Sequence, residues 1–158
     1  MKILLTHPGT QYSHQTAKQL YRKGLLYKFI TGLAIGEKSI FKILLRVSPS
    51  RFTKPVSNRI ITGVPASKLK TYPLTEYRFV SRAQKATNKE AVWFERNEYF
   101  QQKVPAKLIQ HSDLLIGFDT SSWILQQRAK AMGKKFILDV SIAHSVSKNT
   151  VYKNIAAQ

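Results

Sequence analysis

Short apolar runs alternate with segments of helical spacing along this chain, and each apolar run ends in a polar turn. Runs rich in β-branched and aromatic residues are typical of buried strands, whereas apolar residues at every third or fourth position are typical of helices. The first predicted strand begins at Lys2 and is broken by Pro8 and Gly9. The other predicted strands cover residues 25–32, 113–118 and 134–140. The predicted helices cover residues 13–23 and 123–132, and the region 76–110 is largely helical, with Pro105 starting or kinking a last segment.

Most of the predicted strands are apolar along both faces. Such strands belong to parallel sheets that helices cover on both sides. The alternation therefore predicts an α/β fold, a Rossmann-like open parallel sheet with helices on both faces. A chain of 158 residues suits one domain, residues 1–158. Residues 49–65 are weakly patterned, which predicts a long excursion from the sheet.

Positive charge is the strongest feature of the composition. The chain holds 26 Lys and Arg against 8 Asp and Glu, a formal net charge of +18, and Glu37 is the only acid before Glu76. Such a surface attracts polyanions: nucleic acid, anionic lipid head groups or phosphorylated small molecules. A basic, solvated surface without a dedicated partner is the alternative.

The chain contains no cysteine, which excludes disulfides and thiolate metal sites. No stretch resembles a signal peptide, and no uncharged stretch reaches the roughly 18 residues that a membrane span needs. We therefore expect a cytoplasmic protein. The amphipathic segment at residues 38–47 adds peripheral association with the inner face of the membrane to this expectation.

Residues 38–47 have an amphipathic pattern. On a helix, Lys38, Lys42 and Arg46 fall on one side, and apolar residues that include Phe41 and Leu45 cover the rest. A cationic face beside an apolar face suits a helix that lies in the interface of an anionic membrane. The alternative is a helix packed on its own domain with cations at the rim. Further cations downstream extend the basic patch: Arg51, Lys54 and Arg59.

The loop after the first strand is a candidate binding site. Gly9 allows a ligand or a neighbouring backbone to approach, and Thr10 and Gln11 offer hydrogen bonds beside a helix N-terminus, which favours anions. A capped turn with nothing bound is the alternative. The loop has neither the dinucleotide-binding glycine pattern nor a P-loop.

Two later loops have the same construction. Asp119, Thr120 and Ser121 follow a predicted strand, and Asp119 suits action on a sugar hydroxyl or a proton, with helix capping as the alternative. His144 follows the last predicted strand, where its ring suits donation to a hydroxyl or proton uptake near neutrality. A lone histidine is also often structural. The other histidines have no metal-ligand spacing with His144, so no metal site is expected.

Three segments together carry a resemblance to a known family. They are Lys-Ile-Leu-Leu-Thr-His-Pro-Gly-Thr-Gln-Tyr at 2–12, Leu-Leu-Ile-Gly-Phe-Asp-Thr-Ser-Ser at 114–122 and Phe-Ile-Leu-Asp-Val-Ser-Ile-Ala-His at 136–144. Their order and spacing resemble the N-terminal half of a family 4 glycosyltransferase with the GT-B fold, and the likeness spans nearly the whole chain.

The resemblance implies a retaining transfer of a sugar from a nucleotide-sugar donor to a glycan or lipid-linked acceptor, with no cofactor or metal, in a cleft between two Rossmann-like domains. This chain resembles the acceptor-side domain, and the C-terminal domain that binds the nucleotide sugar has no counterpart in it. By the same likeness, Gly9 and Thr10 lie near the donor phosphates and His144 contacts the sugar. We therefore expect the isolated chain to be inactive.

Two functions of other classes remain open. A nucleic-acid binding module would explain the charge, but the chain carries no recognised DNA or RNA motif and its aromatic residues fall on predicted core strands, so nucleic acid is not the expected partner. A Rossmann-like domain that binds a phosphate ligand without catalysis is the other alternative. Binding of single-stranded oligonucleotides that weakens with salt would favour the first.

Overall fold

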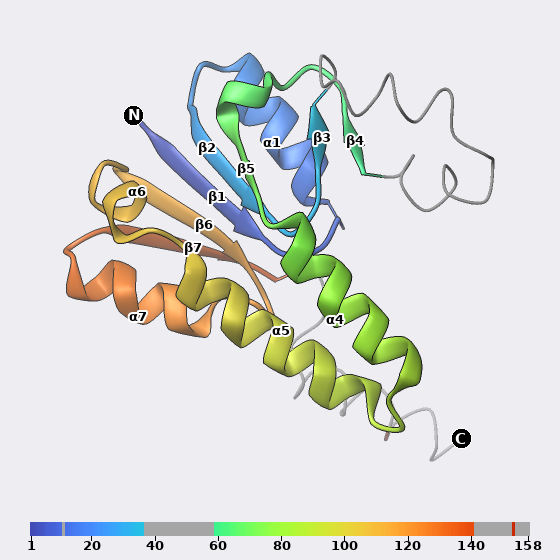
Figure 1. Ribbon diagram of the computed structural model, residues 1–158. Helices are drawn as coiled ribbons and strands as arrows, with labels where there is room; N and C mark the ends of the chain where they lie inside the picture. The colour runs from blue at the N-terminus through green and yellow to red at the C-terminus, as the bar shows by residue number, and fades with distance from the viewer. Residues whose placement is uncertain (11, 37–58, 141–152, 154–158) are drawn as a thin grey trace.

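The computed structural model describes residues 1–10, 12–36, 59–140 and 153, and its larger sheet has five strands (Figure 1). In spatial order they are β5 (Leu69–Thr71), β2 (Leu26–Thr31), β1 (Ile3–His7), β6 (Leu114–Phe118) and β7 (Lys135–Asp139). Every neighbouring pair in this sheet is parallel. The chain is therefore an α/β protein with a Rossmann-like open parallel sheet, which confirms the fold class predicted from the alternation of strands and helices.

Helices cover both faces of this sheet. Those packed on it are α1 (Ser13–Arg22), α5 (Lys89–Lys103), α6 (Ala106–Gln110) and α7 (Trp123–Ala131). On the α1 face, Ala17 packs into a core with Leu5 and Phe29. On the opposite face, α5, α6 and α7 contribute to a second core around Leu4 and Leu115. Leu4 and Leu5 enter different cores because successive residues of a strand point to opposite faces.

The region predicted as largely helical contains three helices. α4 (Pro73–Lys85) and α5 form a hairpin that extends from the sheet (Figure 1), and Phe79 and Val92 pack in a small core between them. Asn88 separates the two helices, and its side-chain oxygen caps α5 by accepting from the N–H of Ala91 at 3.0 Å. α6 follows Pro105 directly, as the proline predicts.

Three strands were not predicted from the sequence. β5 contains a single apolar residue, Leu69, between lysines, and β3 (Ile35–Gly36) and β4 (Ile60–Ile61) have two residues each. β3 and β4 pair with each other in parallel and form a second, small sheet. Because β4 lies in the predicted excursion at 49–65, the last part of that excursion returns to the domain. Runs this short have no usable periodicity.

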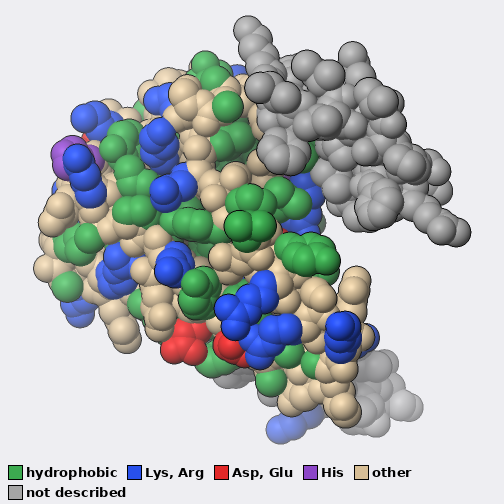
Figure 2. Space-filling model, in the orientation of Figure 1, with side chains coloured by type: hydrophobic (Ala, Val, Ile, Leu, Met, Phe, Trp, Pro, Cys, Tyr) green, Lys and Arg blue, Asp and Glu red, His purple; other side chains and the backbone are tan. Residues whose placement is uncertain are grey.

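Cations are spread over the surface, whereas acids are few, and three of the seven among the described residues belong to α5. Figure 2 shows Lys and Arg side chains over most of one face, and the acidic side chains visible there lie over α5. Among the described residues, no helix has the length and apolar character that crossing a membrane requires. The residues predicted to bind a membrane lie outside the described residues: Lys38, Phe41, Lys42, Leu45 and Arg46.

Gly117 in β6 is required by close packing, and this requirement yields a first prediction. A Cβ at this position would lie 2.7 Å from Cβ of Ser122 and 2.8 Å from the Phe136 ring. We expect Gly117→Ala to lower the free energy of unfolding by about 1–3 kcal/mol through overpacking, measured by urea denaturation. Gly36→Ala is the matched control, because its nearest contact would be an ordinary 3.4 Å. Equal effects of the two variants would refute the packing argument.

Candidate functional site

The carboxyl ends of β1 and β6 define the candidate site. The chain runs outward from β1 to β2 and β5 on one side, and to β6 and β7 on the other. In open α/β sheets, ligands bind at such a switch point, outside the carboxyl ends of the strands. Thr6 pairs in register with Gly117, so the following residues, His7 and Phe118, end their strands at the same level. Their rings lie 4.8 Å apart.

His7 joins the loops that follow these two strands. Its Nδ1 lies 3.2 Å from the hydroxyl oxygen of Ser121, and both side chains are buried. The Ser121 hydroxyl also lies 3.4 Å from the carbonyl oxygen of Phe118, to which it donates. The first and second candidate loops therefore meet at the edge of the sheet that the carboxyl ends of its strands form, although more than a hundred residues separate them in sequence.

Gly9 is constrained by His7. A Cβ at Gly9 would lie 3.2 Å from Nε2 of His7, which is tighter than ordinary contact, and its other nearest atoms belong to the same ring. The Gly9 carbonyl accepts from the hydroxyls of Ser13 at 3.4 Å and Thr31 at 3.5 Å. The absence of a side chain at this position therefore has a local structural reason, in addition to any approach of a ligand.

The other described candidates lie at the same edge of the sheet. Thr10 accepts from the Ser13 hydroxyl through its carbonyl at 2.7 Å and is half-buried. Thr120 is exposed and has a φ of 63°, a left-handed conformation that non-glycine residues seldom adopt. Its carbonyl accepts from the side-chain amide of Asn97 at 2.9 Å, which ties the turn to α5. Gln11 and His144 lie outside the described residues.

Asp119 connects the second loop to the end of a third strand. Its backbone N–H donates to the carbonyl of Asp139, the last residue of β7, at 3.0 Å, and the residue is half-buried. The ends of β1, β6 and β7 thus line one edge of the sheet, as parallel strands require.

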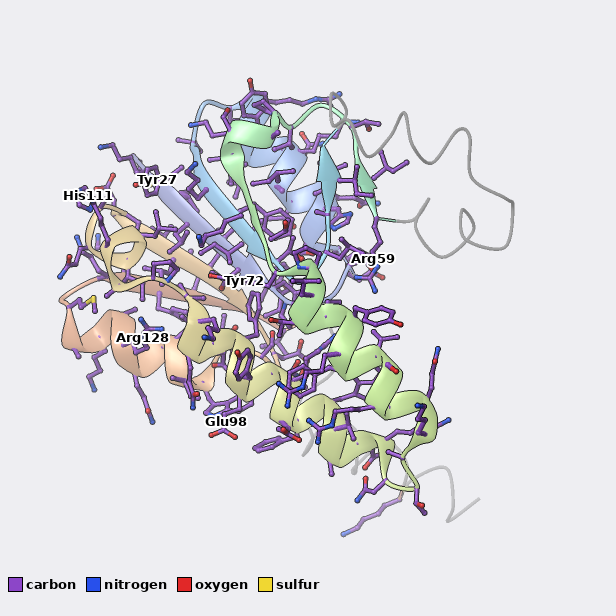
Figure 3. All side chains as sticks on the ribbon, viewed as in Figure 1. Tyr27, Arg59, Tyr72, Glu98, His111 and Arg128 are labelled. Carbon is purple, nitrogen blue, oxygen red and sulfur yellow. The ribbon has the colours of Figure 1, made fainter. Side chains whose placement is uncertain are left out.

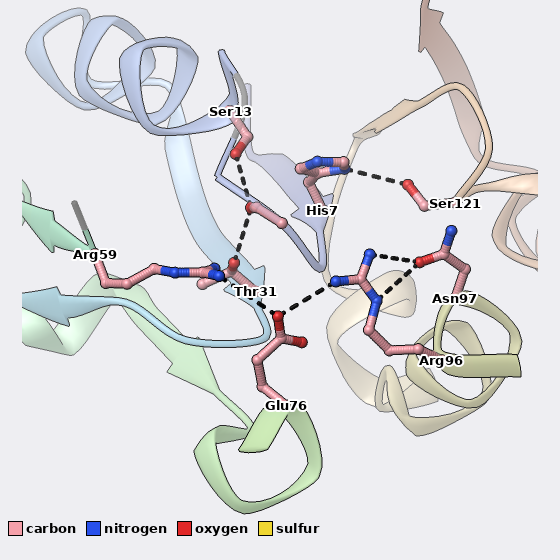
Figure 4. Close-up of polar contacts among 9 residues, drawn as sticks. His7, Ser13, Thr31, Arg59, Glu76, Arg96, Asn97 and Ser121 are labelled. Atoms are coloured by element: carbon pink, nitrogen blue, oxygen red, sulfur yellow. Dashed lines mark hydrogen bonds and ion pairs between the residues drawn. The ribbon is translucent and has the colours of Figure 1, made fainter. Parts of the chain in front are cut away.

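A buried carboxylate lies beside this edge. Glu76, in the first turn of α4, is 4 % exposed, and its Oε1 pairs with Arg59 at 3.7 Å and Arg96 at 3.3 Å (Figure 4). Figure 3 shows Arg59 beside the start of α4. Gly32 makes room for the carboxylate, because a Cβ there would lie 2.6 Å from Oε2. Burial of a carboxylate is costly unless it is paired, and here two guanidinium groups pair with it.

The neighbouring histidines are held neutral. Burial, next the positive charge of Arg96, and last the repulsion from His14 when that ring is also protonated, lower the pKa of His7 to about 4. Burial and the charge of Arg59 lower the pKa of His14 to about 4. Near neutral pH, His7 therefore acts in this site as an uncharged hydrogen-bonding ring that positions Ser121.

Sequence reasoning missed the residues that organise this edge. His7 is the last residue of the first strand, and its position directly before Pro8 and Gly9 is the signal that identifies it. Arg59 was grouped with a basic surface patch, but it is 23 % exposed and pairs with Glu76. Arg96 and Asn97 belong to α5, and nothing in their local sequence indicates contacts with Glu76 and the Thr120 turn.

Comparison with known proteins gives no match: no family model, no curated protein and no solved structure is significantly similar to this chain. The family resemblance therefore depends on the three sequence motifs alone.

The neutral histidines predict a loss of stability in acid. The unfolded chain binds a proton at His7 below its ordinary pKa of 6.5, whereas the folded chain does so only near 4, so stability is full above 6.5 and falls as the pH drops toward 4. The contribution of His7 is about 3 kcal/mol at most. We expect His7→Phe, which keeps a ring against Phe118, to lose less stability than the parent between these pH values in urea denaturation. The exposed control His111→Gln should keep the parental dependence, and an unchanged dependence in His7→Phe would disprove the assignment.

Proposed function

We propose that this chain is the acceptor-side domain of a retaining family 4 glycosyltransferase with the GT-B fold. It would receive a glycan or lipid-linked acceptor, while a second domain would bind the nucleotide-sugar donor. The observation that carries this proposal is the contact between His7 and Ser121, because it joins two of the three motif-bearing loops at the switch point of the sheet.

The chemistry at the edge suits a carbohydrate. Sugar hydroxyls both donate and accept hydrogen bonds, so they are recognised by carboxylates, hydroxyls and backbone groups. Asp119, Thr10 and Thr120 supply such groups near the ends of neighbouring strands. In the proposed reaction, the acceptor oxygen bonds to the anomeric carbon of the donor sugar as the bond from that carbon to the nucleoside diphosphate breaks. The nucleoside diphosphate leaves, and Asp119 or His144 takes the proton of the acceptor hydroxyl. His7 has a positioning role, because its burial keeps the ring uncharged near neutrality.

A matched pair of aspartates tests the proposal, because Asp113 and Asp119 stand directly before and after β6. Asp113 lies at the opposite end of the sheet, where its Oδ2 accepts from the N–H of Lys2 at 2.6 Å. We expect Asp119→Asn to weaken the binding of short glycan acceptors about tenfold in an NMR titration, because a charged hydrogen bond is lost. Asp113→Asn makes the same change of charge and should alter the affinity less than about twofold.

Two results would count against this proposal. Equal loss of binding in both variants would remove the site from the edge that holds Asp119. Turnover of a nucleotide sugar by this chain alone would contradict the assignment of the donor to a second domain. Salt-dependent binding of single-stranded oligonucleotides, with no glycan binding, would instead support the nucleic-acid alternative.

Membrane association is a separate part of the proposal and depends on residues 38–47. Their sequence combines cations with apolar residues at helical spacing, which suits an anionic interface. We expect the chain to sediment with anionic vesicles more than with neutral ones, and Lys42→Glu with Arg46→Glu to abolish the difference. The control is Lys130→Glu with Lys134→Glu on the described domain. This double variant should leave the difference between anionic and neutral vesicles unchanged. Equal binding to both vesicle types would exclude an electrostatic membrane contact.

A further inference from the structure

β7 is the last strand of the larger sheet, and one of its two sides is open. It pairs in parallel with β6, and no other described strand pairs with it (Figure 1). The carbonyl of Asp139 accepts from the N–H of Asp119, which follows β6, so the backbone groups of Asp139 point toward β6. Successive residues of a strand direct these groups to alternate sides, so those of Phe136 and Leu138 point to the open side. An open side of this kind can pair with a further strand.

β7 also exposes apolar side chains. Ile137 is 50 % exposed, Leu138 is 45 % exposed, and Val140, directly after the strand, is 52 % exposed. The other four strands of this sheet, all of them within the described residues, have no exposed large apolar side chain. Ile137 pairs in register with Ile116 and lies on the α1 face, whereas Leu138 lies on the face that α7 covers. Both faces of the sheet therefore offer apolar surface beside the open side of β7.

The charges of β7 are arranged so that the strand is complementary to itself. Its sequence is Lys-Phe-Ile-Leu-Asp, with Lys135 and Asp139 equally far from the central Ile137. These three side chains lie on the same face of the sheet, because side chains alternate along a strand. Lys135 and Asp139 are about 13 Å apart along the strand, too far to pair with each other. Every ion pair among the described residues joins an arginine to a glutamate, so both charges of β7 lack one there.

We propose that two copies of this chain associate through β7, in antiparallel pairing about a two-fold axis at Ile137. In this register Phe136 lies opposite the partner's Leu138, and these two residues exchange backbone hydrogen bonds. Lys135 lies opposite the partner's Asp139 in a pair without backbone hydrogen bonds, where opposed side chains come closest. The two-fold axis repeats each contact, so the interface contains two such charge pairs with Ile137 of both copies between them.

Backbone geometry and charge select the same register. Residues whose backbone groups point to the open side must lie opposite each other, so the two-fold axis passes through a residue and not between two residues. An axis at Phe136 would place Lys135 opposite the partner's Ile137, and an axis at Leu138 would place Asp139 opposite the same residue. Of these three positions, the axis at Ile137 is the one that joins each cation to a carboxylate.

The dimer joins two five-stranded sheets into one continuous sheet. Because strand direction reverses across the two-fold axis, the carboxyl ends of the strands in the two copies point in opposite directions. The candidate site of each copy therefore faces away from that of its partner. The dimer does not depend on the proposed function, since its contacts are those of β7 and involve no carbohydrate.

Sedimentation velocity with charge-swapped variants tests the dimer. We expect the parent chain to dimerise reversibly with a Kd on the order of 10 μM, because a single strand edge makes a small interface. The net charge of +18 on each copy opposes association, so a moderate ionic strength is used, which screens distant charges more than adjoining ones. Lys135→Asp places carboxylates opposite each other twice and should raise the Kd at least about tenfold. Adding Asp139→Lys exchanges the two charges and should restore the parental Kd to within about threefold.

Lys85→Asp is the matched control, because Lys85 is exposed at the end of α4 and its replacement changes the net charge by the same amount. It should change the Kd less than about twofold. Circular dichroism checks that each variant is folded. Amide exchange followed by NMR on the parent chain needs no variant. Protection of the Phe136 and Leu138 amides should rise with protein concentration, whereas the Ile137 amide, which points toward β6, should be protected throughout.

Four results would overturn this dimer. The first is a chain that stays monomeric up to about ten times the expected Kd. The second is an equal effect of Lys135→Asp and Lys85→Asp, and the third is a folded double variant that does not regain the parental Kd. The fourth is protection of the Phe136 and Leu138 amides that does not depend on concentration, because other residues of the same chain would then occupy the open side of β7.

Discussion

The enclosure of β1 is the constraint on which the rest of this structure depends. The strand is hydrogen-bonded to β2 on one side and to β6 on the other. Leu4 and Leu5 pack into cores on opposite faces of the sheet. The last residue of such a strand emerges inside the protein, and His7 is 4 % exposed. Because burial penalises the charged form of its ring, His7 meets Ser121 as a neutral hydrogen-bonding group. The loops that follow β1 and β6 are brought together as a consequence of that packing.

Much of the fold could be predicted because its longer strands have a strong signal. β1, β2, β6 and β7 have five or six residues each, and turn residues separate β1 and β6 from the helices that follow. β3, β4 and β5 were missed because two or three residues cannot show a period, and because they are strands only through their pairing with distant partners. Asn88 is an N-cap residue that divides α4 from α5, a break that the prediction of one largely helical region did not place.

The candidate site, like the fold, could be predicted only in part from the sequence. Parallel strands send their carboxyl ends to one edge, so the meeting of the Gly9 loop with the Asp119 turn followed from the sheet itself. The ion pairs of Glu76 could not be anticipated, because Arg59 precedes a strand that was not predicted and Arg96 lies two turns into another helix. A net charge of +18 suggests a uniformly basic surface, yet two of the cations serve a buried carboxylate.

The contact between Gly9 and His7 bears on how relatives of this chain should be compared. A glycine at this position is favoured in any related chain that keeps the histidine ring in place, whatever that chain binds, because a Cβ would crowd Nε2 of His7. A shared glycine here is thus evidence of common architecture, and a shared function must be traced through other positions.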